Sequence, residues 1–197
     1  MIPSPDGQFV LTGSRDFTIK LWEAATAKEI HTFRGHDGEI TALAFSPDGQ
    51  YFLSGSRDQT IRLWSIPHRK EIYQSKKFNA LSTLTFSPDG QTILITNENI
   101  AQVWAFNHQQ PFDDFPPIQT FREHQNEIEH AAFSPDGQLL ITSSKKKLVK
   151  IWKLGQATAI RTFQATNPIL AIGFTDKDNQ LLICSNKAVQ RLSLIHI

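Results

Sequence analysis

Two landmarks recur along this chain at nearly the same interval, and their repetition limits the possible folds more than any other feature. The pentapeptide SPDGQ recurs at offsets of 42, 41 and 47 residues, beginning at Ser4, Ser46, Ser87 and Ser134. Tryptophan recurs at offsets of 42, 40 and 48 residues, at Trp22, Trp64, Trp104 and Trp152. Two independent landmarks with one period indicate an array of similar units, each about 40–45 residues long.

The residues between the landmarks predict short β-strands joined by tight turns. In Ser-Pro-Asp-Gly, proline presets φ at the first turn position, aspartate suits the second, and glycine adopts the left-handed conformation that closes a hairpin. Segments such as Ile40–Phe45 and Tyr51–Leu53 are apolar almost without alternation, as expected for strands covered on both faces. No segment shows a helical period, so the sequence predicts an all-β fold.

One stretch, Gly35 to Trp64, carries the complete pattern of a unit in the sequence GHDGEITALAFSPDGQYFLSGSRDQTIRLW. With its Gly-His start, SPDGQ turn and closing tryptophan it resembles the WD40 repeat family, and the resemblance covers essentially the whole chain. The near-identical turns are similar to those of bacterial, especially cyanobacterial-type, WD40 arrays. The resemblance implies an all-β WD40 propeller, here incomplete, with about four to five blades of four-stranded antiparallel sheet.

The resemblance divides the chain, as one WD40 domain over 1–197, into units at 1–33, 34–76, 77–121, 122–163 and 164–197. The first unit is expected to lack its innermost strand, the counterpart of Glu39–Phe45, and the fifth its outermost strand. The fifth unit is degenerate, with TDKDNQ in place of SPDGQ and Leu192 in place of tryptophan.

Propellers of the family usually close with seven blades, which takes roughly 290 residues. We therefore expect a fragment of a longer propeller. The alternatives are a protomer that completes a ring with a second chain and a free-standing open array. An unclosed stack leaves an apolar blade face bare at each end, which predicts possible self-association.

Composition bears on partners and compartment. The formal net charge of +1 gives no electrostatic reason to expect nucleic acid or an anionic membrane as a partner. No run of residues approaches the roughly 18 apolar positions of a membrane-spanning helix. The single cysteine, Cys184, cannot form an internal disulfide and favours a reducing compartment. We expect a cytoplasmic protein.

Four residues of the second unit, His36, Ser54, Asp58 and Trp64, include the residue types of a hydrolase triad. The resemblance implies a structural role instead, in which these positions form one hydrogen-bonded network inside a blade. A catalytic serine would also need exposure and an oxyanion hole, and the sequence indicates neither.

The corresponding positions of the other units match the family's network pattern less completely. The first unit offers Thr12, Asp16 and Trp22, and the fourth offers His124, Thr142 and Trp152, with Lys146 where the aspartate belongs. The third keeps only Trp104, with Ile95 at the serine position, and the fifth keeps none. We therefore expect the third and fifth units to be the least rigid. The remaining histidines and Cys184 lack metal-ligand spacing and no Gly-rich phosphate loop is present, so no metal or cofactor is predicted.

Two regions are candidates for partner binding. In the family, partners often bind where the second hairpin turn meets the start of the innermost strand, and the matching residues here are Arg15, Glu39, Thr41, Arg57, Glu127, Glu129 and Lys145. The other region is the insertion Asn107–Pro117, whose Phe112 and Phe115 make it more apolar than an ordinary connector. It could instead pack on its own blade.

The function most consistent with these features is a non-catalytic scaffold that binds other proteins or peptides through propeller surfaces. The alternative is a regulatory or sensing module of a larger multidomain enzyme, such as a kinase or an ATPase. A hydrolase that uses Ser54 and His36 is the third hypothesis, and labelling of Ser54 by a fluorophosphonate would reveal it.

Overall fold

The computed structural model describes residues 1–76, 78, 81–110, 112–175 and 180–192, and these residues form five antiparallel sheets. Each sheet is called a blade and takes its strands consecutively from the chain. Blade 1 contains β1 (Ile2–Pro3), β2 (Phe9–Gly13), β3 (Ile19–Glu23) and β4 (Glu29–Phe33). Blade 2 contains β5 (Ile40–Phe45), β6 (Tyr51–Ser56), β7 (Ile61–Ser65) and β8 (Lys70–Gln74).

The remaining blades follow the same order. Blade 3 contains β9 (Leu81–Phe86), β10 (Thr92–Asn97), β11 (Ile100–Ala105) and β12 (Gln119–Phe121), with the 3-10 turn η1 (Phe112–Asp114) between its last two strands. Blade 4 contains β13 (Ile128–Phe133), β14 (Leu139–Ser144), β15 (Leu148–Lys153) and β16 (Ala159–Gln164). Blade 5 contains β17 (Ile169–Phe174), β18 (Leu181–Ser185) and β19 (Val189–Leu192). The predicted all-β class is confirmed, with four-stranded antiparallel sheets in blades 1 to 4 and three strands in the described part of blade 5.

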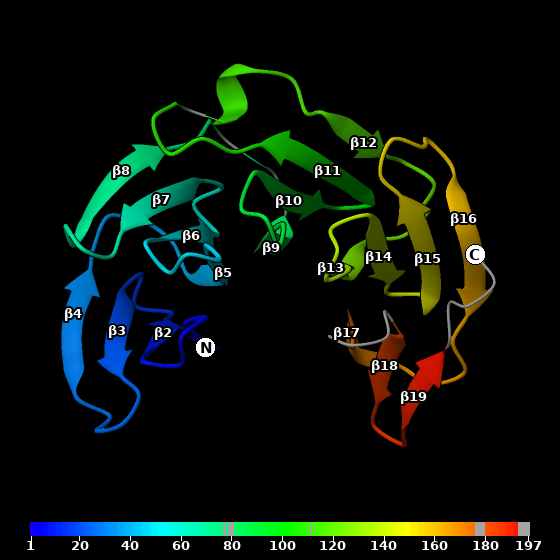
Figure 1. Ribbon diagram of the computed structural model, residues 1–197, viewed down its shortest axis with the longest axis horizontal. Coiled ribbons are helices and arrows are strands. Elements are labelled where there is room, and N and C mark those ends of the chain that lie inside the picture. The colour runs from blue at the N-terminus through cyan, green and yellow to red at the C-terminus, as the bar shows by residue number, and fades with distance from the viewer. Residues whose placement is uncertain (77, 79–80, 111, 176–179, 193–197) are drawn as a thin grey trace.

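The blades lie side by side around an open arc, with blades 1 and 5 at its two ends (Figure 1). Strands β5, β9, β13 and β17 lie on the inner side of the arc, and β8, β12 and β16 follow its perimeter. Consecutive strands are antiparallel, so the SPDGQ turns lie at one end of the sheets and the turns after β2, β6, β10 and β14 at the other. These two surfaces are called the SPDGQ face and the hairpin-tip face.

The SPDGQ turns hold their shape through a bond pattern that repeats in blades 1 to 4. In blade 2, Ser46 Oγ donates to Asp48 Oδ1 at 2.5 Å and accepts from the Tyr51 N–H at 3.0 Å. Gly49 has a φ of 67°, a conformation that favours glycine. A Cβ built on Gly90 would lie 3.5 Å from Pro47 of the preceding blade. The turns therefore also pack against one another around the arc.

Apolar side chains of adjacent blades form the cores. Leu11 and Leu21 of blade 1 pack with Phe52 and Trp64 of blade 2, and corresponding clusters join each later pair of blades. A Cβ on Gly55 would overlap the Leu81 side chain, so this glycine lets blade 3 approach closely. Each blade is thus stabilised by its neighbours rather than by a core of its own.

The first unit was expected to lack an innermost strand, and this expectation is wrong because a strand of two residues is present there. Ile2 and Pro3 form the short strand β1, with Ile2 opposite Leu11 and Pro3 opposite Val10 of β2. Two residues are too few to show a strand pattern in the sequence, and sheet pairing alone reveals them. In blade 5, Leu192 lies opposite Leu181, as Trp152 lies opposite Leu140 in blade 4. Four residues of the TDKDNQ segment, 176–179, lie outside the described residues. Within the described part of the chain, no helix is long and apolar enough to cross a membrane.

Candidate functional site

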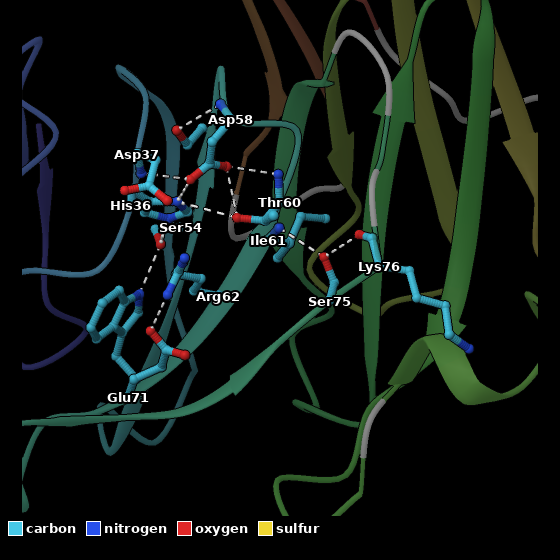
Figure 2. Close-up of polar contacts among 12 residues, drawn as sticks. His36, Asp37, Ser54, Asp58, Thr60, Ile61, Arg62, Glu71, Ser75 and Lys76 are labelled. Atoms are coloured by element: carbon cyan, nitrogen blue, oxygen red, sulfur yellow. Dashed lines mark hydrogen bonds and ion pairs between the residues drawn. The ribbon is translucent and has the colours of Figure 1, made fainter.

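The structure joins His36, Ser54, Asp58 and Trp64 into one chain of hydrogen bonds in blade 2 (Figure 2). Trp64 Nε1 donates to Ser54 Oγ at 2.8 Å, and Ser54 Oγ lies 2.7 Å from His36 Nε2. His36 Nδ1 lies 2.7 Å from Asp58 Oδ2. Because Ser54 Oγ accepts from the indole, its own proton is available to Nε2, and a neutral His36 then donates from Nδ1 to the carboxylate. Every member has a partner.

Burial and hydrogen bonding set the charge states of this network. Burial lowers the pKa of His36, and the Asp58 carboxylate only partly opposes that shift. Burial alone would raise the pKa of Asp58, but hydrogen bonds from Thr60, the Asp37 N–H and His36 lower it to about 2. Near neutral pH the network therefore pairs a neutral imidazole with an ionised carboxylate.

Blade 4 contains part of the same arrangement. Trp152 Nε1 donates to Thr142 Oγ1 at 2.9 Å, and Thr142 Oγ1 lies 2.7 Å from His124 Nε2. His124 Nδ1 is buried and has no hydrogen-bond partner among the described residues, because Lys146 stands where blade 2 has Asp58. Burial and the nearby Lys150 charge lower the pKa of His124 to about 4.

Blade 1 has a shorter version, and blade 3 has none. Trp22 Nε1 donates to Thr12 Oγ1 at 2.8 Å, while Asp16 accepts from Thr18 within the hairpin turn. In blade 3, Trp104 Nε1 is buried without a hydrogen-bond partner among the described residues.

An aromatic cluster occupies the corresponding region of blade 3. The ring centroids of Phe78 and Phe112 lie 5.9 and 6.0 Å from that of Trp104, both nearly perpendicular to it. Phe112 comes from η1, in the insertion Asn107–Pro117, and Asp113 Oδ2 of the same turn accepts from the Lys76 N–H at 2.6 Å. Phe112 is only 6% exposed, so its side chain is not available to a partner, whereas Phe115 is 60% exposed.

The hairpin-tip face carries two ion pairs in equivalent positions. Arg57 Nε lies 3.0 Å from Glu39 Oε2 in blade 2, and Lys145 Nζ lies 2.5 Å from Glu127 Oε2 in blade 4. The backbone hydrogen bonds are also equivalent. The Arg57 N–H donates to the Glu39 carbonyl at 2.8 Å, and the Lys145 N–H donates to the Glu127 carbonyl at 2.9 Å. The Glu127 carboxylate raises the pKa of Lys145. Arg15 is exposed at the matching position of blade 1.

Each innermost strand from β5 to β17 has a β-bulge at its second residue. The bulged residues are Thr41, Ser82, Glu129 and Leu170. Bulges re-aim side chains near functional sites. The sequence predicted Thr41 and Glu129 as partner contacts but missed Ser82 and Leu170, which only the register of the repeats could have shown. Thr41 and Ser82 line a cavity of about 290 Å³ on the inner side of blades 1 to 3.

The family is decided by a comparison with models of known families. The model of the WD domain, G-beta repeat (WD40), matches residues 1–23, 27–65 and 115–153, just over half of the chain. The chain belongs to the WD40 repeat family. The matched segments cover most of blades 1, 2 and 4, and the unmatched parts include most of the insertion of blade 3 and all of blade 5.

Two WD-repeat relatives match nearly the whole chain, and a third matches a shorter part of it. The anaphase-promoting complex subunit cdc20 of Dictyostelium discoideum is 27% identical over 181 residues, which is 91% of this chain and 34% of that protein. The periodic tryptophan protein 2 homolog of the same organism is 26% identical over 199 residues, or 95% of this chain and 20% of that protein. The human WD repeat and SOCS box-containing protein 1 is 34% identical over 77 residues, or 38% of this chain and 17% of that protein. The chain thus spans about a third or less of each of these relatives. A bacterial-type origin stays a prediction.

Proposed function

We propose that the chain is a non-catalytic protein-interaction module that binds proteins or peptides through its hairpin-tip face. The observation that carries this proposal is the repeated construction of that face in blades 2 and 4. In both blades an exposed cation–anion pair is fixed by the same backbone hydrogen bond between the hairpin tip and the preceding loop. Charges held on a rigid backbone favour specific recognition of a charged partner surface.

Membership of the WD40 family and the names of the relatives agree with an interaction role. The cdc20 relative is named as a subunit of a complex, and the chain aligns with it over 91% of its own length. A cytoplasmic location, a lack of nucleic-acid or membrane partners and self-association through blade faces are further proposals that rest on sequence alone.

The buried network supports a structural role rather than hydrolysis. Ser54 is 0% exposed, and its Oγ is bonded to both Trp64 Nε1 and His36 Nε2, so the oxygen has no open approach for a substrate. A serine nucleophile needs such an approach and an oxyanion hole. We assign Ser54, His36, Asp58 and Trp64 to holding the hairpin tip of blade 2 against the loop before β5. Within the described residues, no three His, Cys, Asp or Glu side chains cluster as a metal site would require.

One observation favours the second candidate, a regulatory or sensing module of a larger protein such as a multidomain kinase or ATPase. The aligned region is only 34%, 20% and 17% of three relatives, so these domains occur within longer chains. The same face would then bind a partner or a neighbouring domain.

Comparative capture from a lysate of the source organism tests the proposal. The tip variant, Arg15→Glu with Arg57→Glu and Lys145→Glu, reverses three charges on the hairpin-tip face. The control variant, Lys28→Glu with Lys70→Glu and Lys153→Glu, makes the same charge change at three exposed residues toward the SPDGQ face. We expect the tip variant to lose proteins that the wild type and the control retain, as quantified by mass spectrometry. Equal losses from both variants would contradict the proposal.

A further inference from the structure

A cavity of about 470 Å³ opens on the hairpin-tip face between blades 2 and 4. Arg57 lines it from the blade 2 tip and Glu127 from the loop before blade 4, while Phe78 and Leu81 supply its apolar lining at the entry to blade 3. The volume is in the range of small-ligand sites, and a sphere of that size is about 10 Å wide. It is large enough for one apolar side chain with polar atoms around it.

The short hairpin of blade 3 accounts for this hollow. Only Glu98 and Asn99 separate β10 from β11, whereas residues 57–60 separate β6 from β7. Neither Glu98 nor Asn99 lines the cavity, and Asn99 Nδ2 instead donates to the His124 carbonyl of the next unit at 2.8 Å. The sides of the cavity are therefore formed by the longer hairpin of blade 2 and by the loop before blade 4.

The two apolar lining residues are held in place by packing against blades 3 and 2. Phe78 packs edge-to-face on Trp104, and the Leu81 side chain packs on Gly55, where a Cβ atom at position 55 would overlap it. Figure 2 shows Ser75 bonded to both the Ile61 N–H, at 2.8 Å, and the Lys76 carbonyl, at 2.7 Å, which fixes the chain just before this lining.

The charges on the two sides are opposite and exchangeable. The Arg57 side chain is 71% exposed and that of Glu127 is 41% exposed, and each pairs with a neighbour at the solvent boundary. Exposed ion pairs contribute little stability, so a ligand carboxylate could replace Glu39 on Arg57 and a ligand ammonium could replace Lys145 on Glu127. Thr41 and Gln59 add neutral hydrogen-bonding groups for a peptide backbone.

We propose that this cavity receives an extended peptide segment in which an apolar side chain lies between an acidic and a basic residue. The apolar side chain contacts Phe78 and Leu81, the acidic residue pairs with Arg57 and the basic residue with Glu127. The inference rests on the proposed function, and it specifies the chemistry of one partner segment on that face. In an extended peptide with one residue between each pair, the acidic and basic residues each lie about 7 Å from the apolar residue, on the same side of the chain, so the apolar side chain can enter the cavity while the charged ones reach its two edges.

Three fluorescein-labelled pentapeptides test the proposal by fluorescence anisotropy. The mixed probe is Asp-Gly-Leu-Gly-Lys, and the like-charged probes are Asp-Gly-Leu-Gly-Asp and Lys-Gly-Leu-Gly-Lys. We expect the wild type to bind the mixed probe about tenfold more tightly than either like-charged probe. Arg57→Glu should shift the preference to the basic probe, and Glu127→Lys to the acidic probe.

Lys153→Glu is the matched control, because it makes the same charge change at an exposed residue toward the SPDGQ face that does not line the cavity. It should leave all three affinities within about twofold of wild type. All four proteins should melt at similar temperatures, because the altered side chains are exposed.

Two results would overturn the inference. If the Arg57 and Glu127 variants bind the probes as wild type does, or if Lys153→Glu weakens binding equally, the peptide does not lie in this cavity. If no probe binds, the assigned peptide chemistry is wrong. In either case the capture experiment with the tip and control variants still decides the proposed function separately.

Discussion

His36 and His124 occupy the same position in two blades but differ in one partner. Both rings contact a buried hydroxyl that accepts from a tryptophan N–H, at 2.7 Å in each blade. Only His36 has a carboxylate at Nδ1. The two blades therefore allow the contribution of that single carboxylate to be measured within one protein.

Removing the imidazole of blade 2 should destabilise the fold. His36→Ala leaves Ser54 Oγ and Asp58 without their shared partner, and an unsatisfied buried polar group costs about 1–3 kcal/mol. Urea denaturation followed by circular dichroism would measure the free energy of unfolding. His68→Ala, at an exposed histidine, is the control and should change that free energy by less than about 0.5 kcal/mol. Equal stability of the His36 variant and wild type would refute the structural role.

Supplying the missing carboxylate in blade 4 should stabilise the protein. Lys146→Asp places an acceptor at the position of Asp58, within the same turn conformation, since Gln59 and Lys147 both have positive φ values of 70° and 63°. We expect a gain of about 1 kcal/mol in the free energy of unfolding at pH 7, because His124 Nδ1 would gain a partner. Lys146→Ala removes the charge without adding an acceptor and should not reproduce the gain. A gain that is the same in both variants would mean that only the lysine charge matters.

Acid should destabilise the protein in two steps. The folded-state pKa of His124 lies below its ordinary 6.5, at about 4, so the stability it contributes is complete above pH 6.5 and is lost as the pH falls toward 4. The pKa of Asp58 is lowered from 3.8 to about 2, so its contribution is lost as the pH falls through that lower range. In urea titrations at several pH values, His124→Gln should reduce the slope with which the free energy of unfolding falls between pH 6.5 and pH 4. An unchanged slope would assign that loss to other groups.

In blade 3, the sequence predicted that the hydrogen-bond network is missing but not which residues replace it. The loss of its network was predictable, because Ile95 replaces the serine and no histidine or aspartate follows the family pattern. The replacement was not, because Phe112 reaches Trp104 from an insertion with no counterpart in the other repeats. Long-range packing of a loop leaves no periodic signal in one sequence.

The insertion should therefore matter for stability through one phenylalanine and not the other. Phe112→Ala removes a buried ring and should lower the free energy of unfolding by about 3–4 kcal/mol. Phe115→Ala, at a ring that is 60% exposed, is the matched control and should change it by less than about 0.5 kcal/mol. Urea denaturation of both variants makes the comparison, and equal effects would contradict the packing described for η1.

At the scale of the whole molecule, the repeat period was enough to predict the order of strands and the two faces. The SPDGQ turns and hairpin tips alternate along the chain, so an antiparallel blade must place them at opposite ends. The period was not enough to predict the bulges that turn Ser82 and Leu170 out of the ladder, or the cavity over blade 3. Those features depend on register and on how neighbouring blades differ in height.

The hairpin tips of blades 1 to 4 lie at the same end of their antiparallel sheets, opposite the SPDGQ turns, and this arrangement is the basis of the proposed interaction role. Site-specific photo-crosslinking compares that surface with the opposite one most directly. A benzophenone amino acid is placed singly at Arg15 or Lys145 on the hairpin-tip face, and at Lys28 or Lys153 toward the SPDGQ face. After irradiation in cells of the source organism, we predict discrete higher-mass adducts from the first pair of positions and none above background from the second. Adducts from the SPDGQ-face positions alone would contradict the assignment of the binding surface.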